Sequence, residues 1–208
     1  MSILYLFISL AVGYLLGAIP FAVIIASAKG VDILSYGSGN PGATNVKRAC
    51  GTFAGRLCFV CDALKGFIAA FWPYAAAYFG GTFAGIAPVN MALVGLVGAI
   101  IGHTFSMFLK FKGGKGVSVT IGALCAVLPY PILIGLILWL IFFYSSKMVS
   151  LASIAMAFSL PFSCMYFYGM GTAQFYVALA LGAFVIYRHK SNIKRILNGT
   201  EYKFTKKQ

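Results

Sequence analysis

Residues 86–115 read IAPVNMALVGLVGAIIGHTFSMFLKFKGGK, and this stretch decides the fold. Its first part, Ile86–Leu109, contains no Lys, Arg, Asp or Glu and is long enough to cross a bilayer, since a membrane helix needs about 20 apolar residues. A lysine-rich segment, Lys110–Lys115, follows it, and an uncharged turn, Gly80–Gly85, precedes it. Because cytoplasmic loops of membrane proteins are enriched in Lys and Arg, the stretch predicts a span whose carboxyl end is cytoplasmic.

The same alternation runs through the whole chain, because all sixteen Lys and Arg residues lie in four patches. These patches are Lys29–Lys65, Lys110–Lys115, Lys147 and Arg188–Lys207. Between them lie apolar stretches and three uncharged turns, which are Gly80–Gly85, Pro129–Pro131 and Gly169–Thr172. The candidate spans are Ile3–Ala28, Leu57–Phe79, Ile86–Leu109, Val117–Leu128, Ile132–Ser145, Val149–Tyr168 and Ala173–Tyr187.

The number of spans follows from where the charges must lie. The segments Val117–Leu128 and Ile132–Ser145 are short, and one long kinked helix is the alternative to two spans. Only an odd number of spans places every basic patch on the cytoplasmic side. The sequence therefore predicts an all-α polytopic membrane protein with seven transmembrane helices, its N-terminus outside and its C-terminus cytoplasmic. The first span lacks a basic n-region and exceeds the length of a signal peptide's apolar core, so we expect it to be retained.

Composition agrees with a membrane protein that has no separate soluble domain. Hydrophobic residues make up 61% of the 208 residues and charged residues 9%, whereas an ordinary soluble domain is about a quarter charged. We expect a single domain over residues 1–208. The net charge of +13 favours membrane lipids or small anionic substrates over a nucleic acid, since much of the excess is explained by topology. Cys58 and Cys61 form a CxxC, but the two histidines lie far apart in sequence, so no zinc site is expected. The cysteine count of five is odd, and no disulfide framework is predicted.

The first of three polar clusters is GSGNPGATNVKR, residues 37–48. Its glycines permit positive φ and let backbone N–H groups approach a ligand closely. Ser38, Thr44 and Asn45 add side-chain donors, and Arg48 adds a planar fork suited to phosphate. The glycine spacing is not a dinucleotide fingerprint, because no βαβ unit surrounds it. The alternative is an ordinary interhelical loop, in which Gly, Pro and Asn are common for turn reasons alone.

The second cluster is Gly102–Ser106 followed by KFKGGKG, residues 110–116. Glycines with interleaved lysines are typical of a loop whose backbone N–H groups bind phosphate. It is not a Walker A loop, because no Ser or Thr follows Lys115. A lysine cluster set by topology alone is the alternative, but topology requires no glycines.

The third cluster is RHKSNIKRILNGTE, residues 188–201. As a helix continuing the last span, it places His189, Asn192 and Arg195 on one face, and Gly199 ends it. A basic tail lying on anionic lipid is the alternative. In the second span, Asp62 and Lys65 lie about one turn apart, which favours a structural ion pair over base catalysis by Asp62.

Together these three clusters resemble the three motifs of the bacterial acyl-phosphate-dependent glycerol-3-phosphate acyltransferases. The resemblance runs the length of the chain in the same order and spacing, and it includes Asp62-x-x-Lys65-Gly66. Ser106 stands where Pro is usual and Lys190 where Arg is common; the former predicts a looser helix end.

The resemblance implies an enzyme that moves the acyl group of acyl phosphate to the 1-hydroxyl of glycerol 3-phosphate. The products are lysophosphatidic acid and phosphate, the first step of phospholipid synthesis, and no cofactor is expected. It implies a bacterial inner-membrane location with a cytoplasmic active site, and a catalytic group of Ser38, Arg48, His189 and Asn192. The implied substrate-binding residues are Gly37, Gly39, Asn40, Thr44, Asn45, Lys112, Gly113, Gly114, Lys115, Gly116 and Glu201, the last with a structural or supporting role.

Elementary electrostatics agrees with that reaction. Two unit charges 4 Å apart repel by about 4 kcal/mol at an effective dielectric of about 20, and Arg48, Lys112 and Lys115 would offset the repulsion between two anionic substrates. The proton acceptor stays open between His189 and a phosphate oxygen of the substrate. Ser38 is favoured as a hydrogen-bond donor over a nucleophile, since no base with an orienting acid lies near it in sequence. A small anion transporter is the rival from another class, although such proteins place polar groups at the bilayer midplane.

Overall fold

The computed structural model describes residues 2–204, so the last lysines of the basic tail, Lys206 and Lys207, lie outside the described residues. All regular structure in the described part is helical. The chain forms two compact units, one ending at Val127 and the other beginning at Leu128.

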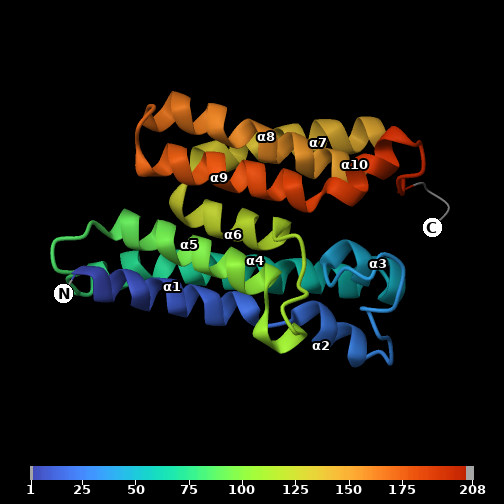
Figure 1. Cartoon of the computed structure of the whole chain (residues 1–208), viewed down its shortest axis with the longest axis horizontal. Helices are drawn as coiled ribbons and strands as arrows, with labels where there is room; N and C mark the ends of the chain where they lie inside the picture. Colours follow the sequence, from blue (N-terminus) through green and yellow to red (C-terminus); the bar gives the residue numbers. More distant parts are fainter. Residues whose placement is uncertain (1, 205–208) are drawn as a thin grey trace. The chain divides into compact units, whose positions relative to one another are not determined.

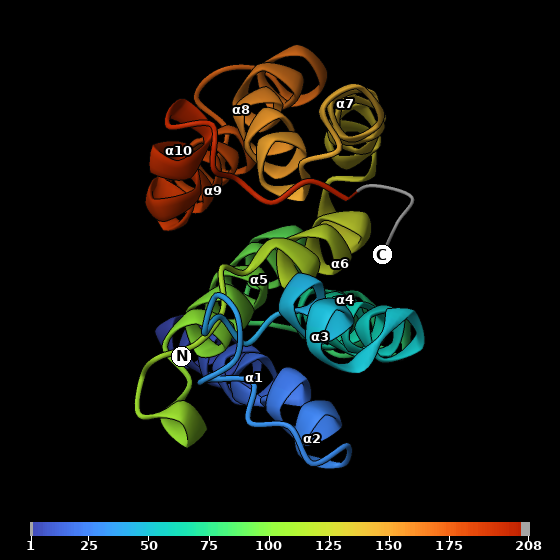
Figure 2. The same ribbon diagram turned by 90° about the vertical axis from the view of Figure 1, so that its right-hand side faces the viewer.

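The first unit contains six α-helices and one short 3-10 helix. They are α1 (Ser2–Ala18), α2 (Phe21–Ser27), α3 (Ala43–Cys50), α4 (Thr52–Tyr78), α5 (Pro88–Thr104), η1 (Met107–Leu109) and α6 (Val117–Val127). Figure 1 shows α1 running along α5, and the turned view in Figure 2 shows α4 beside α5 and α6, in agreement with their contacts.

Small residues allow these helices to approach closely. A side-chain carbon on Gly13 or Gly17 of α1 would overlap the backbone of Gly95 or Ala99 of α5. In the same way, Gly122 of α6 lies against the backbone of Ala63 of α4. Contacts of this kind are typical of membrane helices, whose association depends on packing rather than on the hydrophobic effect.

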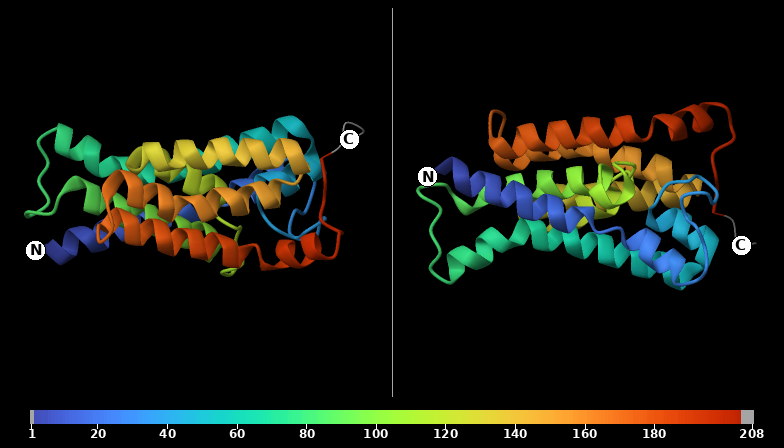
Figure 3. Two further views of the ribbon diagram at one scale, coloured as in Figure 1. Left: turned by 90° about the horizontal axis from the view of Figure 1, so that it is seen from above. Right: turned by 60° about the horizontal axis from the view of Figure 1, so that its bottom comes forward.

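The two ends of the first unit differ in character. The N-terminus and the α4–α5 loop lie at one end, whereas α2, α3 and the loop between them lie at the other (Figure 3). The residues of the first polar cluster therefore gather at the end of the unit opposite the uncharged turn Gly80–Gly85.

The second unit contains α7 (Pro129–Ser146), α8 (Val149–Tyr168), α9 (Ala173–Arg188) and α10 (Lys190–Leu197). Helix α8 contacts both α7 and α9, and α10 follows α9 after a break of one residue, His189. The predicted continuation of the last span through residue 197 is therefore wrong in detail. His189 adopts φ −95° and ψ 9°, which ends one helix and begins the next.

Within residues 2–204, four helical segments are long and apolar enough to cross a membrane, where the sequence predicts seven spans. They are Ser2–Ser27, Pro88–Leu109, Pro129–Ser146 and Val149–Tyr168. The remaining predicted positions are helical as well: α4 has 27 residues but carries Arg56, Asp62 and Lys65, and α6 and α9 are shorter apolar helices. The stretch 117–145 forms two helices, α6 and α7, as predicted, but they are separated at Leu128. The predicted turn Pro129–Pro131 is instead the first turn of α7, because a proline at the start of a helix lacks an N–H that the helix does not need there.

Two local features differ from the sequence prediction. The first span is broken between Ala18 and Phe21, because Pro20 has no N–H with which to continue the helix. The loop after it contains α3, which the sequence reading missed. Helix α3 has only eight residues and lies between Gly42 and Gly51. Several of its residues have a low helix propensity, so the sequence gives little indication of a helix.

Candidate functional site

The first polar cluster forms a tight loop that is closed from inside by Asn45. The Asn45 amide donates hydrogen bonds to the backbone oxygens of Ile33 (3.2 Å) and Tyr36 (2.9 Å), and its oxygen accepts one from the Ser38 N–H (3.4 Å). Gly37 has φ +58° and lies against the Asn45 side chain, so a larger residue there would be strained and would collide with it. Asn45 is therefore the residue that holds the loop in shape.

The loop leads directly into the N-terminus of α3. Gly42 precedes the helix in an extended conformation (φ −145°), so only Gly37 and Gly39 of the three glycines adopt positive φ. A helix N-terminus presents unpaired N–H groups and a partial positive charge, which suit an anion. The first turn of α3 contains no acidic residue, and Arg48 lies in its last turn, half-buried.

Ser38 is exposed at the outer part of this loop. Its hydroxyl accepts a hydrogen bond from the Asn40 N–H at 3.4 Å. Thr44 is half-buried in the first turn of α3. These polar side chains are thus presented around the same loop and helix start.

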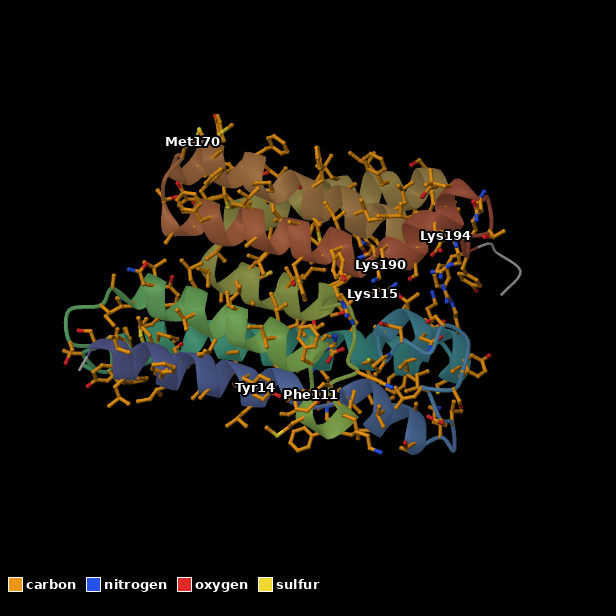
Figure 4. The ribbon with its side chains drawn as sticks, in the orientation of Figure 1. Tyr14, Phe111, Lys115, Met170, Lys190 and Lys194 are labelled. Carbon is orange, nitrogen blue, oxygen red and sulfur yellow. The ribbon has the colours of Figure 1, made fainter. Side chains whose placement is uncertain are left out.

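The second polar cluster repeats this arrangement at α6. After η1, the chain passes through Lys110 and Phe111, both with left-handed φ, and reaches α6 through Gly116 (φ +82°). Lys112 is exposed and Lys115 half-buried. Figure 4 labels Phe111 and Lys115 in this loop. The loop residues predicted to bind phosphate therefore lead into a second helix N-terminus that has no acidic residue in its first turn.

Glycine is required at the centre of this loop because it packs onto the end of α5. The Gly113 N–H donates to the Thr104 carbonyl (2.9 Å) and the Gly114 N–H to the His103 carbonyl (3.1 Å). A side-chain carbon on Gly113 would overlap the His103 carbonyl, and one on Gly114 would overlap the His103 ring. The same carbon on Gly114 would lie 3.1 Å from the Pro41 carbonyl oxygen, so the first two clusters meet at this point.

A buried group of ionisable side chains lies beside that meeting point. Lys65 Nζ and Asp62 Oδ1 of α4 form an ion pair at 2.8 Å, and His103 Nδ1 lies 3.8 Å from the same carboxylate oxygen. Lys65 also donates a hydrogen bond of 2.7 Å to the carbonyl of Ile19, at the break between α1 and α2. A small pocket lies here. It is lined by Pro41 of the first polar cluster, by Gly114 of the second, and by the side chains of the ion pair and of His103.

Ser106 ties this region to α1 rather than loosening it. Its hydroxyl is buried and donates a hydrogen bond of 2.6 Å to the carbonyl of Ala18, the last residue of α1. The expectation of a looser helix end at Ser106 is therefore wrong, because the side chain satisfies a carbonyl that the broken helix leaves without its usual partner.

The third cluster lies in the second unit and is organised around Glu201. This carboxylate accepts hydrogen bonds from Ser150 (2.8 Å), Asn192 (2.8 Å) and Arg195 (2.7 Å). The His189 ring is buried, with Nδ1 2.7 Å from the Val185 carbonyl oxygen. Lys190 and Lys194, labelled in Figure 4, are exposed, whereas His189 and Asn192 are buried.

Comparisons with known proteins give the family. A family model for glycerol-3-phosphate acyltransferases matches residues 7–199. A glycerol-3-phosphate acyltransferase of Thermosipho melanesiensis is 43% identical over 195 residues, which cover 94% of this chain and 90% of that protein. Another from Fusobacterium nucleatum is 44% identical over 192 residues, covering 92% of this chain and 94% of its own length.

The chain belongs to the glycerol-3-phosphate acyltransferase family.

Solved structures agree with this assignment. The crystal structure of PlsY (YgiH), an integral membrane glycerol 3-phosphate acyltransferase, in its glycerol 3-phosphate form is 37% identical with a TM-score of 0.82. That match covers 98% of this chain and 96% of that one. The lysophosphatidic acid form is 38% identical with a TM-score of 0.81, covering 96% and 95%. This acyltransferase therefore has the all-helical, membrane-integral fold of PlsY.

The fold of this acyltransferase brings some of the predicted site residues together. The first and second clusters meet at Pro41 and Gly114, while His189, Asn192 and Glu201 lie in the second unit. Sequence reasoning gave no role to His103, although it stands inside the second cluster. The sequence offered one sign of a role for His103. It follows Gly102 at the end of the apolar stretch that comes after the stretch with Asp62 and Lys65. Nothing in the sequence showed that these side chains would meet.

Proposed function

We propose that this acyltransferase transfers the acyl group of an acyl phosphate to the 1-hydroxyl of glycerol 3-phosphate and releases lysophosphatidic acid and phosphate. The observation that carries the proposal is the pair of glycine loops, residues 37–42 and 112–116, which meet and each lead into a helix N-terminus without acidic residues. Two such sites suit two phosphorylated reactants, because the first turn of each helix presents backbone N–H groups to an anion and cations lie nearby in the sequence.

Each cluster has a separate task in this proposal. The loop 112–116 binds the phosphate of the acyl donor, with Lys112 and Lys115 offsetting its charge. Ser38 and Arg48, with Gly37, Gly39, Asn40, Thr44 and Asn45 shaping their loop, bind glycerol 3-phosphate and orient its hydroxyl. His189 and Asn192 of the second unit take part in catalysis, and Glu201 supports Asn192 through the hydrogen bond between them.

The chemistry needs little from the protein beyond positioning and charge. Acyl phosphate is already activated, so the hydroxyl of glycerol 3-phosphate attacks its carbonyl carbon directly. The bond from that carbon to the phosphate oxygen breaks, and phosphate leaves with the electron pair. Cations and helix N-termini stabilise the departing phosphate, and holding the hydroxyl near the carbonyl contributes by proximity. The hydroxyl proton passes to His189 or to a phosphate oxygen.

The proposal extends to the membrane. The basic patches indicate that the first and second clusters lie on the cytoplasmic side of a bacterial inner membrane, with seven spans and the N-terminus outside. A donor with a long acyl chain would then reach the site from the lipid, and glycerol 3-phosphate from the cytoplasm.

A direct assay tests the donor. Purified protein with palmitoyl phosphate and glycerol 3-phosphate should form lysophosphatidic acid, whereas palmitoyl-CoA should not support the reaction, and a chelator should leave the rate unchanged. Turnover with palmitoyl-CoA but not with palmitoyl phosphate would overturn the choice of donor. Uptake of labelled glycerol 3-phosphate into sealed vesicles without lysophosphatidic acid would indicate a transporter instead.

A matched pair of variants tests the role of Arg48. We expect Arg48→Lys to lower kcat/KM for glycerol 3-phosphate by about 10- to 150-fold, because a lysine cannot make the bidentate contact and such a contact is worth about 1.5–3 kcal/mol. Arg56→Lys is the control, since Arg56 is exposed on the neighbouring helix α4. Equal rates for the two variants would contradict the assignment.

A further inference from the structure

Helix α4 buries an ion pair that the proposed reaction does not use. Asp62 is 1% exposed and Lys65 4% exposed. A buried ion pair adds little net stability compared with apolar side chains of similar size, since desolvation offsets the attraction. A role other than stability is therefore worth seeking in what the pair contacts.

The contacts of the pair lead in two directions. Lys65 reaches the α1–α2 break, where it donates to the Ile19 carbonyl. Asp62 reaches α5, where its Oδ1 lies 3.8 Å from His103 Nδ1, which is longer than a hydrogen bond. At this distance the carboxylate attracts a ring that carries a proton on Nδ1. Its other oxygen, Oδ2, lies 3.8 Å from the Cys58 thiol. One carboxylate thus faces an ammonium, an imidazole and a thiol.

His103 connects this pair with the second glycine loop. Its ring lies so close to Gly114 that no side chain fits there, and its carbonyl accepts the Gly114 N–H. The ring is only 8% exposed, and it lines the same small pocket as Gly114 and Pro41. The His103 ring is therefore in direct contact with the loop at Gly114.

We propose that Asp62 and Lys65 are positioning residues that fix the His103 ring and, through it, the shape of the loop 112–116. Asp62 orients the ring from the Nδ1 side, and Lys65 neutralises Asp62 and fastens it to the α1–α2 break. The effect on catalysis rests on the proposed function, in which this loop binds the phosphate of the acyl donor. The effect on loop conformation does not depend on that function.

Two double variants separate positioning from simple charge neutralisation. Asp62→Asn/Lys65→Met and Asp62→Leu/Lys65→Met both remove the two charges, so neither leaves a buried charge unpaired. Only the Asn variant keeps an oxygen that attracts His103 Nδ1. Asp32→Asn is the control, because it removes an exposed carboxylate in the same unit.

The kinetic readout is the KM for acyl phosphate. We expect it to rise about tenfold in the Leu variant and to stay within about threefold of wild type in the Asn variant and the control. The KM for glycerol 3-phosphate and the thermal midpoint should be similar in both double variants. Equal KM values for acyl phosphate in the two double variants would overturn the proposal.

Amide hydrogen exchange gives a readout that needs no substrate. The Gly113 and Gly114 N–H groups donate to Thr104 and His103, so their exchange reports the loop directly. We expect these amides to exchange about tenfold faster in the Leu variant than in the Asn variant. Equal exchange would overturn the positioning role even if the wild-type protein prefers another acyl donor. Wild-type turnover with palmitoyl phosphate tests the donor separately.

Discussion

Glu201 accepts hydrogen bonds from three residues of the second unit, and its titration reports on all of them. Burial raises the pKa of this carboxyl, but hydrogen bonds from Asn192, Arg195 and Ser150 and the charge of Arg195 outweigh burial and hold the pKa below its usual 4.5. Because the folded-state pKa is the lower one, the carboxylate stabilises the fold above pH 4.5, and this stabilisation is lost as the pH falls through the folded-state pKa.

We expect Glu201→Gln to lower the free energy of unfolding by about 1–2 kcal/mol at neutral pH, since hydrogen bonds to a charged group are replaced by weaker ones. The difference from wild type should shrink as the pH falls through the folded-state pKa of Glu201. Equilibrium unfolding of both proteins in detergent at several pH values measures this difference in free energy. A difference that is constant over the whole acid range would show that the charge of Glu201 does not matter.

Helices α4 and α6 pack through glycines, which makes their contact sensitive to added volume. Gly122 lies against the backbone of Ala63, and Gly66 against that of Val119. We expect Gly122→Leu to destabilise the protein by about 1–3 kcal/mol through overpacking, although leucine is the better helix former by somewhat under 1 kcal/mol. Thermal unfolding of the purified variant measures this effect.

Cys125→Leu is the matched control for this helix, because Cys125 is exposed on α6 three residues from Gly122. It should change stability little. If both leucine variants unfold like wild type, the close approach of α4 and α6 does not limit stability.

The whole molecule is predicted to cross the membrane with its basic segments inside. After replacement of the five native cysteines, single cysteines at Lys29 and Lys110 should react with an impermeant thiol reagent only after the cells are opened. Cysteines at Thr82 and Met170, which are exposed in uncharged turns, should react in intact cells. Labelling of the Lys29 and Lys110 positions from opposite sides would refute both the topology and the proposed function.

The long apolar helices and the family could be predicted from the sequence, whereas helix α3 and the break at Pro20 could not. Apolar stretches such as Val149–Tyr168 are recognisable locally, because every residue of a span meets the same apolar solvent. The three polar clusters were also recognisable locally, because the glycines and basic residues of each cluster lie within a few consecutive positions. Gly199 was also read correctly as a helix stop, and it adopts φ +69° after α10.

Only the tertiary structure decided how particular side chains are used. It turned Asn45 inward to hold its own loop, gave Ser106 a partner in α1, and brought His103 to Asp62 and Gly114. These contacts join residues from separate helices, and their existence depends on how closely the glycines allow those helices to approach. Hydrophobic periodicity specifies that a helix forms but not which neighbour each of its side chains will meet.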